Sequence, residues 1–346
     1  MKQSLYHTYK RYRTLQSHNI SVLPIVILMP HSACNCRCVM CDIWKDNKNL
    51  KQLTIADVAG LLGSLKKLDT KQVVMSGGEA LLNPHFFALC EILRNEGIKI
   101  TLLSTGLSIK KHAAAIIKWA DELIVSIDGD EALHDAIRNI PGAFARLKEG
   151  VEYILALNPT YKVTARTVIH RLNFRNWPAI IIAAKQMGIS QISFLPADVS
   201  SSAFNRQTAW DEPKQHEILL SWDELPALQE IITHLLEKNI SDFKAKFIAE
   251  SMRKIQDIYH YYAAFYDFNA YPLKKCNAPW VSTVVEADGS VKPCFFHETI
   301  GNIKDSDLTT ILNSKKAIGF RKSLNTKTNA TCVKCVCSLN LSPLSS

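Results

Sequence analysis

The chain has 346 residues, of which 47% are hydrophobic, and a formal net charge of +9. This length predicts one large domain with a smaller one, and the spread of the charge predicts only a weak attraction for anionic substrates or nucleic acid. Ten cysteines, with no visible signal peptide and no apolar run long enough to cross a bilayer, argue against a secreted disulfide framework and a membrane protein. A cytoplasmic location and metal or redox use of the thiols are therefore expected.

From residue 23 to about 196, short apolar runs alternate with helical periodicity, which predicts parallel β/α units. The expected strands are Leu23–Met29, Gln72–Ser76, Lys99–Leu103, Leu123–Ile127, Lys162–Val168 and Gln191–Leu195. The expected helices are Thr54–Leu65, Pro84–Glu96, Lys110–Trp119, Ala143–Ala156 and Trp177–Met187, the first of them begun by a Thr54–Asp57 capping box. Six such repeats favour a partial (β/α)6 barrel over a full eight-stranded one, which typically needs about 250 residues.

Three cysteines follow the first expected strand with the spacing Cys-x3-Cys-x2-Cys, namely Cys34, Cys38 and Cys41. Three thiolates are one ligand short of an iron–sulfur cluster, which normally takes four, so the open position is expected to bind another group. Zinc is the alternative, although it usually takes Cys-x2-Cys pairs and a fourth ligand. Cys36 breaks the spacing and is expected to be a non-ligand that faces away.

This spacing and its setting resemble the radical S-adenosylmethionine (SAM) enzymes, in which the open iron of a [4Fe-4S] cluster binds SAM. After the second expected strand, Gly77-Gly78-Glu79 resembles the motif that holds the amino group of SAM in this family, with Ala80 in place of the usual proline. The ends of the third and fourth strands match as well. The resemblance implies that polar groups of SAM are met by Thr105, Ser126 and Asp128, and its carboxylate by Arg138, because guanidinium suits carboxylate recognition.

Residues 197–275 differ in character from the barrel repeats. The polar, Ser-rich segment 197–217 is expected to be a loop or lid over the barrel mouth. Two helices are expected at Trp222–Lys238 and Phe243–Phe265. The aromatic residues that end the second are expected to pack between domains rather than to bind nucleic acid.

A second set of cysteines lies in the C-terminal part, at Cys276, Cys294, Cys332, Cys335 and Cys337. The first two flank an expected hairpin, Val281–Glu286 and Ser290–Lys292, turned by Asp288-Gly289. Taken alone, two such cysteine pairs would suit a zinc ribbon as well as an iron–sulfur cluster.

After a radical SAM core, Gly289-x4-Cys294 and Gly301-Asn302-Ile303 resemble the SPASM/twitch extension, which carries auxiliary iron–sulfur clusters. The resemblance implies one auxiliary [4Fe-4S] cluster held by Cys276, Cys294, Cys332 and Cys335, with Cys337 able to replace one of the last pair. A cluster with four protein ligands has no open iron and would pass electrons.

The resemblance thus implies an α/β fold, with a partial (β/α)6 TIM-like barrel of the radical SAM type and a small C-terminal twitch/SPASM-like domain of a β-hairpin plus helix. The expected bounds are a basic N-terminal extension at 1–20, the barrel core at 21–215, a helical connector at 216–270 and the auxiliary cluster domain at 271–346.

The implied activity is reductive cleavage of SAM to a 5′-deoxyadenosyl radical, which removes a hydrogen atom from the substrate. The auxiliary cluster would assist a two-electron oxidation or rearrangement, in an arrangement similar to aminocyclitol dehydrogenases and molybdenum-cofactor cyclases. A flavodoxin- or ferredoxin-type electron donor is implied, with no membrane or nucleic-acid partner. Arg166, His297 and Glu298 are candidate catalytic residues by position only.

The sequence leaves two substrate classes open, a small molecule and a peptide. Only 33 residues precede Cys34, which favours a small-molecule substrate, and a SPASM-type peptide-modifying maturase is the alternative. A zinc-dependent nucleic-acid-binding module is the alternative from another class of protein.

Overall fold

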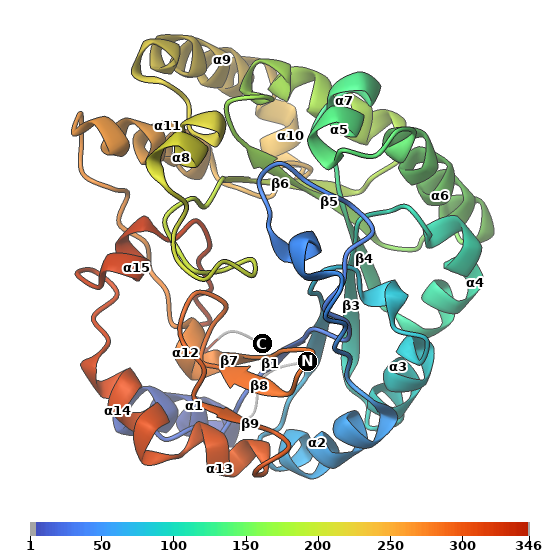
Figure 1. Ribbon diagram of the computed structural model, residues 1–346, viewed down its shortest axis with the longest axis vertical. Helices are drawn as coiled ribbons and strands as arrows, with labels where there is room; N and C mark the ends of the chain where they lie inside the picture. Colours follow the sequence, from blue (N-terminus) through green and yellow to red (C-terminus); the bar gives the residue numbers. More distant parts are fainter. Residues whose placement is uncertain (1–4, 345–346) are drawn as a thin grey trace.

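The computed structural model describes residues 5–344, and its centre is a curved sheet with helices along the outer side (Figure 1). Strands run in the order β6-β5-β4-β3-β2-β1-β7-β8-β9. The first six are β1 (Ile25–Leu28), β2 (Gln72–Met75), β3 (Lys99–Ser104), β4 (Glu122–Ser126), β5 (Val163–Ile169) and β6 (Gln191–Pro196). Neighbours among them pair in parallel. The sheet is open, with β6 and β9 at its two ends, so the predicted parallel α/β core is confirmed as a partial barrel.

The helices between these strands follow the predicted amphipathic segments. They are α2 (Ile55–Lys67), α3 (Phe86–Asn95), α4 (Ile109–Trp119), α6 (Ala143–Leu157) and α7 (Trp177–Gln186). Each expected strand and helix of the core lies within two residues of its observed bounds. The capping box of Thr54 and Asp57 begins α2, and the buried side chains Leu61 and Leu65 face the core. Fully burying one such leucine stabilises the fold by about 1.5–3 kcal/mol.

Buried and less buried side chains alternate along several of the barrel strands. On β5, Val163, Ala165 and Thr167 are buried on the outer, helix-covered face, whereas Arg166 between them is exposed. The hydrophobic core therefore lies between strands and helices. The other face of the strands carries both apolar side chains, such as Ile27 and Val74, and polar ones, such as Ser126 and Arg166.

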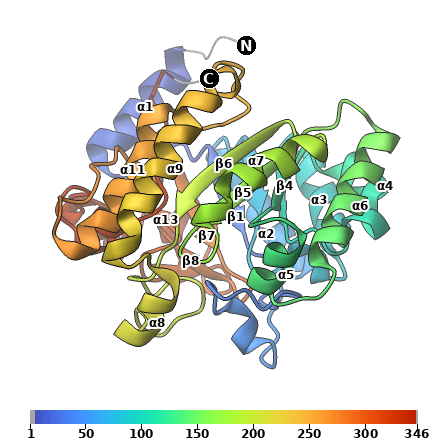
Figure 2. The same cartoon turned by 90° about the horizontal axis from the view of Figure 1, so that it is seen from above.

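The remaining helices of the first 270 residues lie outside these repeating strand–helix units. They are α1 (Leu5–Ser17), α5 (Glu131–Arg138), α8 (Glu212–Ile218), α9 (Leu225–Lys238), α10 (Ile240–Lys244) and α11 (Met252–Ala263). Figure 2 shows α9 beside α11. The single helix expected at Phe243–Phe265 is wrong, because Lys246 has a left-handed backbone (φ 60°) and Ile248 forms a parallel bridge with Ile192 of β6.

The C-terminal part extends the barrel sheet. Strand β7 (Ser282–Val285) pairs in parallel with β1, and β8 (Ser290–Lys292) and β9 (Gly301–Asn302) follow antiparallel. The predicted hairpin turned by Asp288-Gly289 is thus confirmed, with Gly289 at φ 89°. The helices here are α12 (Ala278–Val281), α13 (Leu308–Leu312), α14 (Lys315–Ser323) and α15 (Ala330–Lys334). Short 3-10 helices occur at η1 (Ile43–Asp46), η2 (Ala80–Leu82), η3 (Phe174–Asn176), η4 (Trp222–Glu224) and η5 (Ala264–Tyr266).

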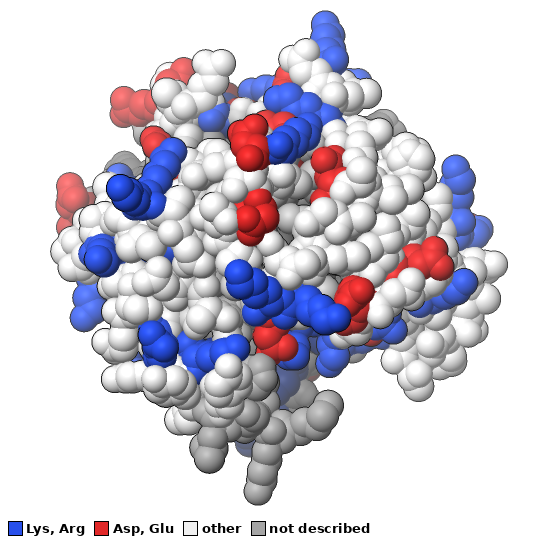
Figure 3. All heavy atoms as spheres, turned by 90° about the horizontal axis from the view of Figure 1, so that it is seen from below, with Lys and Arg blue, Asp and Glu red and all other residues white. Residues whose placement is uncertain are grey.

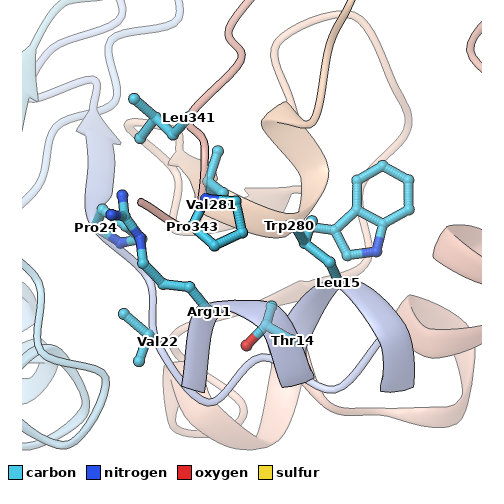
Figure 4. Close-up of a pocket in the computed structure, with 9 residues that line it drawn as sticks. All are labelled: Arg11, Thr14, Leu15, Val22, Pro24, Trp280, Val281, Leu341 and Pro343. Atoms are coloured by element: carbon cyan, nitrogen blue, oxygen red, sulfur yellow. The ribbon is translucent and has the colours of Figure 1, made fainter. Parts of the chain in front are cut away.

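The two ends of the chain pack against each other under β1. A void of about 10 Å³ at this seam has room for roughly one water molecule, and Figure 4 shows the side chains around it. It is lined by Arg11, Thr14, Leu15, Val22, Pro24, Trp280, Val281, Leu341 and Pro343. A void of this size holds no substrate.

Two surface properties bear on partners. On the face that Figure 3 shows, Lys and Arg side chains are interspersed with Asp and Glu, as the spread of charge in the sequence predicts. Among the described helices, none is both long and apolar enough to cross a membrane.

Candidate active site

The first three cysteines lie together in the loop that follows β1. Cys38 is buried, while Cys34 and Cys41 are half-buried. Cys36 does not face away as expected, because its thiol is hydrogen-bonded with the side chains of Cys34 and Cys38. Hydrogen bonding with the Cys34 side chain, followed in weight by burial, also raises the pKa of the Cys36 thiol to about 12. Four thiols therefore share this small volume.

The cysteine loop has no regular secondary structure and is fixed by hydrogen bonds from its neighbours. Asn47 accepts from the Cys34 N–H at 3.0 Å and donates to the Cys34 carbonyl at 2.9 Å. The backbone N–H groups of Arg37 and Val39 donate to carbonyls at the C-terminal end of α5, each at 3.0 Å. The loop is therefore held in one shape by protein contacts alone.

Arg138, the last residue of α5, lies beside the cysteines. It forms an ion pair with Asp128, and its Nη1 donates to Cys38 Sγ at 3.5 Å. Asp128 is fully buried, which raises the pKa of its carboxyl, while Arg138 acts in the opposite direction. Asp128 and Arg138, which the resemblance assigns separately to SAM, thus form an ion pair with each other.

Glu79 is also fully buried, and its carboxylate is hydrogen-bonded to other groups of the protein. Its carboxylate accepts from Ser104 Oγ at 3.0 Å, from Thr105 N–H at 2.7 Å, from Thr105 Oγ1 at 2.6 Å and from Leu81 N–H at 3.2 Å. Thr105 Oγ1 lies 2.9 Å from Asn35 Oδ1 in the cysteine loop. Glu79 therefore joins the end of β3 to the loop after β2, and burial raises its pKa.

The two glycines before Glu79 are required by close approach of the cysteine loop. Gly77 has a φ of 111°, which side chains rarely adopt. A Cβ on Gly78 would lie 2.1 Å from the carbonyl oxygen of Ala33, so only glycine fits there. Both glycines also line the cavity described below.

Residues 198–210, here called the strap, cross over this loop. Asp198 and Arg206 form an ion pair at 2.8 Å with both side chains only 1% exposed. The Arg206 guanidinium lies 3.8 Å from the ring centre of Trp210 and donates to the Met40 carbonyl at 3.4 Å. Trp210 Nε1 donates to Asp42 at 2.7 Å. The strap is thus anchored on both sides of Cys41.

The other side of the strap contacts the second cysteine set. The ring of Phe204 meets Phe295 edge-on at 4.9 Å and Phe296 at 6.3 Å, immediately after Cys294. Phe204 and Asn205 both have a left-handed backbone, at φ 61° and 64°. Sequence reasoning expected a lid here but singled out none of its residues, because a polar segment without periodicity gives no signal of its contacts.

The second set of cysteines gathers around Cys294. Burial, and after it the charges of Cys276 and Cys332, raise the pKa of the Cys294 thiol to about 12. Cys335 Sγ donates to the carbonyl of Cys337 at 3.0 Å. The structure therefore brings the C-terminal cysteines together from three separate segments.

The three candidate catalytic residues lie apart. His297 Nε2 is 3.4 Å from Cys332 Sγ, so it belongs to the second cysteine set. Glu298 is exposed next to it. Arg166 lies on β5, opposite Ser126 of β4 in the strand register.

A cavity of about 210 Å³ lies between the two cysteine regions. It is lined by Met29, His31, Ser32, Ile43, Asp46, Lys51, Gly77, Gly78, Ser202, Phe204, Asn205, Arg206, Glu286, Ala287, Asp288, Lys292 and Phe295. These residues come from the cysteine loop, the glycine loop, the strap and the C-terminal hairpin. The walls are polar and apolar in about equal measure and carry both signs of charge, a mixture that suits a ligand with polar groups.

Known proteins share this architecture. Residues 28–181 match the radical SAM superfamily, and residues 276–336 match SPASM, an iron-sulfur cluster-binding domain. An AdoMet-dependent heme synthase from Methanosarcina barkeri is 25% identical over 161 residues, 45% of this chain and 46% of that protein. A "Probable GTP 3′,8-cyclase" from Methanococcus maripaludis is 25% identical over 192 residues, 54% of this chain and 61% of that protein. SuiB from Streptococcus suis, in a crystal structure with its precursor peptide SuiA, has a TM-score of 0.65 at 16% identity and covers 97% of this chain and 78% of its own.

The chain spans about half the length of the curated relatives it matches. The likeness to SuiB concerns the fold. Fold and sequence matches together define a radical SAM protein with an open parallel barrel. The chain carries a radical SAM domain followed by a C-terminal SPASM domain.

These two families bind SAM and [4Fe-4S] clusters. In the part of the chain that the structure describes, no three His, Cys, Asp or Glu side chains lie close enough to hold a single metal ion. A four-iron cluster is larger than one ion and takes thiolate ligands. The donor set fits such a cluster, because three thiols of one loop lie near one another and the Arg138 guanidinium donates to one of them, Cys38 Sγ.

Proposed function

We propose that this enzyme cleaves SAM reductively and oxidises or rearranges a small polar substrate in the cavity between its two cysteine regions. The observation that carries the proposal is the cavity of about 210 Å³ itself, lined on one side by the Gly77–Gly78 loop and on the other by the SPASM hairpin. When bound, the first cluster and SAM supply a 5′-deoxyadenosyl radical that removes a hydrogen atom from the substrate.

The residues divide into two sets of ligands in this proposal. Cys34, Cys38 and Cys41 hold the first cluster, and the glycine loop leaves room for SAM beside it. The second cluster is held by Cys276, Cys294, Cys332 and Cys335. Cys335 is preferred over Cys337 as the last ligand because the match to the SPASM domain ends at residue 336.

The second cluster would accept an electron from the substrate radical, which completes a two-electron oxidation. Reduction of the first cluster would come from a flavodoxin- or ferredoxin-type donor. The match to an iron-sulfur cluster-binding SPASM domain supports this division of work, because a cluster with four protein ligands would exchange electrons without binding substrate.

A small molecule is the preferred substrate because the cavity holds only about 210 Å³ and the strap, fixed at both of its sides, forms part of its wall. Relatives that act on small molecules include the cyclase and the heme synthase. A peptide is the second candidate, and the observation that favours it is the likeness in fold to SuiB, which was crystallised with its precursor peptide.

The test is formation of 5′-deoxyadenosine from SAM by the anaerobically reconstituted enzyme with a strong reductant. We expect wild type and the control Cys90→Ala, which changes a buried core thiol of α3, to form it. Cys38→Ala is expected to form none. Equal product from both variants would contradict the proposal.

A further inference from the structure

His297 joins two of the segments that carry the second set of cysteines. Its Nε2 lies 3.4 Å from Cys332 Sγ in α15, which is within hydrogen-bond reach of a sulfur atom. Its backbone N–H donates to the carbonyl of Cys294 at 3.3 Å. One histidine therefore contacts a cysteine in each of two segments that lie far apart in the sequence.

The imidazole ring is held in this position by its surroundings. It meets the ring of Phe320 in α14 edge-on, with the ring centres 4.9 Å apart and the planes at 65°. The segment that follows the histidine is tied to the same helix, because Lys316 donates to the Thr299 carbonyl at 2.7 Å. Cys332 is fixed as well, since Asn329 at the start of α15 accepts from its N–H at 3.1 Å. The contact between ring and thiol thus lies between two anchored segments.

The direction of the hydrogen bond follows from the chemistry of the two groups. A cysteine that binds iron does so as a thiolate, which accepts hydrogen bonds and has no proton to donate. The imidazole nitrogen beside it must therefore carry the proton. His297 then stands to Cys332 as Arg138 stands to Cys38, whose Sγ accepts from the guanidinium at 3.5 Å.

Direct binding of iron by His297 is the alternative to a hydrogen bond. Five cysteines of this part of the chain are available as ligands, so four thiolates can be supplied without a nitrogen: Cys276, Cys294, Cys332, Cys335 and Cys337. A [4Fe-4S] cluster is held by cysteine thiolates. The Nε2 atom also lies against the sulfur of a cysteine that is itself a ligand in the proposed function. These observations favour a donor over a ligand.

We propose that His297 donates a hydrogen bond from Nε2 to the Cys332 thiolate and so raises the reduction potential of the second cluster. Reduction adds negative charge to the cluster and its sulfur ligands, so a hydrogen bond to one of these sulfurs stabilises the reduced form more than the oxidised form. The inference rests on the proposed function, in which Cys332 is a ligand of this cluster. It adds that His297 favours electron transfer toward the cluster. His297 is then a positioning residue that acts through Cys332 without touching substrate.

The experiment compares the reconstituted holoenzyme with two variants and a matched control. His297→Phe keeps an aromatic ring against Phe320 and removes the donor, whereas His297→Gln keeps an N–H donor on its side-chain amide. The control is His112→Phe, which changes a histidine of α4 that packs against the ring of Phe87, with ring centres 5.6 Å apart. EPR-monitored redox titration gives the midpoint potential of the second cluster. Its signal is separated from that of the first because SAM binds only at an open iron.

We expect His297→Phe to retain its iron and to lower the ratio of reduced to oxidised second cluster about tenfold at a fixed potential. For a one-electron couple this is a midpoint about 59 mV more negative. His297→Gln should recover most of the shift, and His112→Phe should match wild type. The proposal is overturned if His297→Phe has the same midpoint potential as this control.

A second measurement needs no variant, so it decides the proposal where His297→Phe does not assemble its cluster. Wild type is produced with isotope-labelled histidine, and pulsed EPR detects the coupling of a histidine nitrogen to the reduced second cluster. We expect a weak coupling, because the nitrogen reaches the iron only through a hydrogen bond and a sulfur atom. The absence of this coupling, or a coupling of the strength of an iron-bound nitrogen, would overturn the proposal.

Failure of this inference is distinguishable from failure of the proposed function. Cys332→Ala removes a ligand of the second cluster in that function. Both fail if Cys332→Ala keeps about eight irons and the EPR signal of the second cluster. Only the inference fails if Cys332→Ala loses this signal while His297→Phe keeps the wild-type potential.

Discussion

The guanidinium of Arg138 donates to Cys38 Sγ at 3.5 Å while it is paired with the fully buried carboxylate of Asp128. This places one positive charge between the Cys38 thiol and a buried negative charge. The pair therefore links the stability of the barrel to the electrostatics of the first cysteine loop.

Arg138→Gln should be strongly destabilising because it leaves Asp128 buried without its partner. We expect the free energy of unfolding to fall by about 3–5 kcal/mol, and the double variant with Asp128→Asn to recover part of this loss. Loss of the positive charge should also make the midpoint potential of the first cluster more negative. Denaturant unfolding and an EPR-monitored redox titration measure these quantities. Arg146→Gln, on the exposed face of α6, is the control, and a variant no weaker than this control would contradict the expectation.

Trp210→Phe should loosen the first cluster, because it removes the hydrogen bond to Asp42 and leaves the strap without one of its anchors. We expect iron to be lost from the first cluster to a chelator about tenfold faster, since a hydrogen bond to a charged group contributes about 1.5–3 kcal/mol. The matched control is Trp222→Phe, whose side chain is exposed. The strap has no such function if the two variants lose iron at the same rate.

Acid should destabilise the fold through His134, which is fully buried on α5 and accepts from the Asp128 N–H at 3.2 Å. Burial lowers the pKa of His134 from 6.5 to about 3. Between these values the unfolded chain binds a proton that the folded chain does not, so stability is present above pH 6.5 and is lost as pH falls toward about 3. His134→Gln should reduce the dependence of the unfolding midpoint on pH between about 7.5 and 5. An unchanged slope in that variant would show that His134 is not the titrating group.

The local sequence pattern predicted the barrel well, because the alternation of apolar residues in strands and their helical periodicity depend on residues close together in the chain. The Thr54–Asp57 capping box and the Asp288-Gly289 turn are of this kind, and both occur as expected. The pairing of β7 with β1 was not predictable, since it joins residues more than 250 positions apart. The break of the expected helix at Lys246 was not predictable for a similar reason, because the chain there forms a β-bridge between Ile248 and Ile192 of β6.

The site was predicted in its residues more than in its contacts. Motif position indicated that Asp128 and Arg138 lie at the end of β4 and just beyond, but not that each neutralises the other. Glu79 was expected to meet an ammonium group, yet Ser104 and Thr105 supply its donors. The position of a residue in the sequence indicates at which edge of a sheet its side chain lies. Only the packed structure shows whether another group of the protein pairs with its charge.

The measurement that tests the central claim most directly combines iron content with SAM cleavage in two variants. One changes Cys34, Cys38 and Cys41 to alanine, and the other changes Cys276, Cys294, Cys332 and Cys335. Wild type should hold about eight irons and each variant about four, from one [4Fe-4S] cluster each. Only the first variant should fail to form 5′-deoxyadenosine. Formation of 5′-deoxyadenosine by the first variant, or eight irons in the second, would contradict the assignment of two clusters with separate tasks.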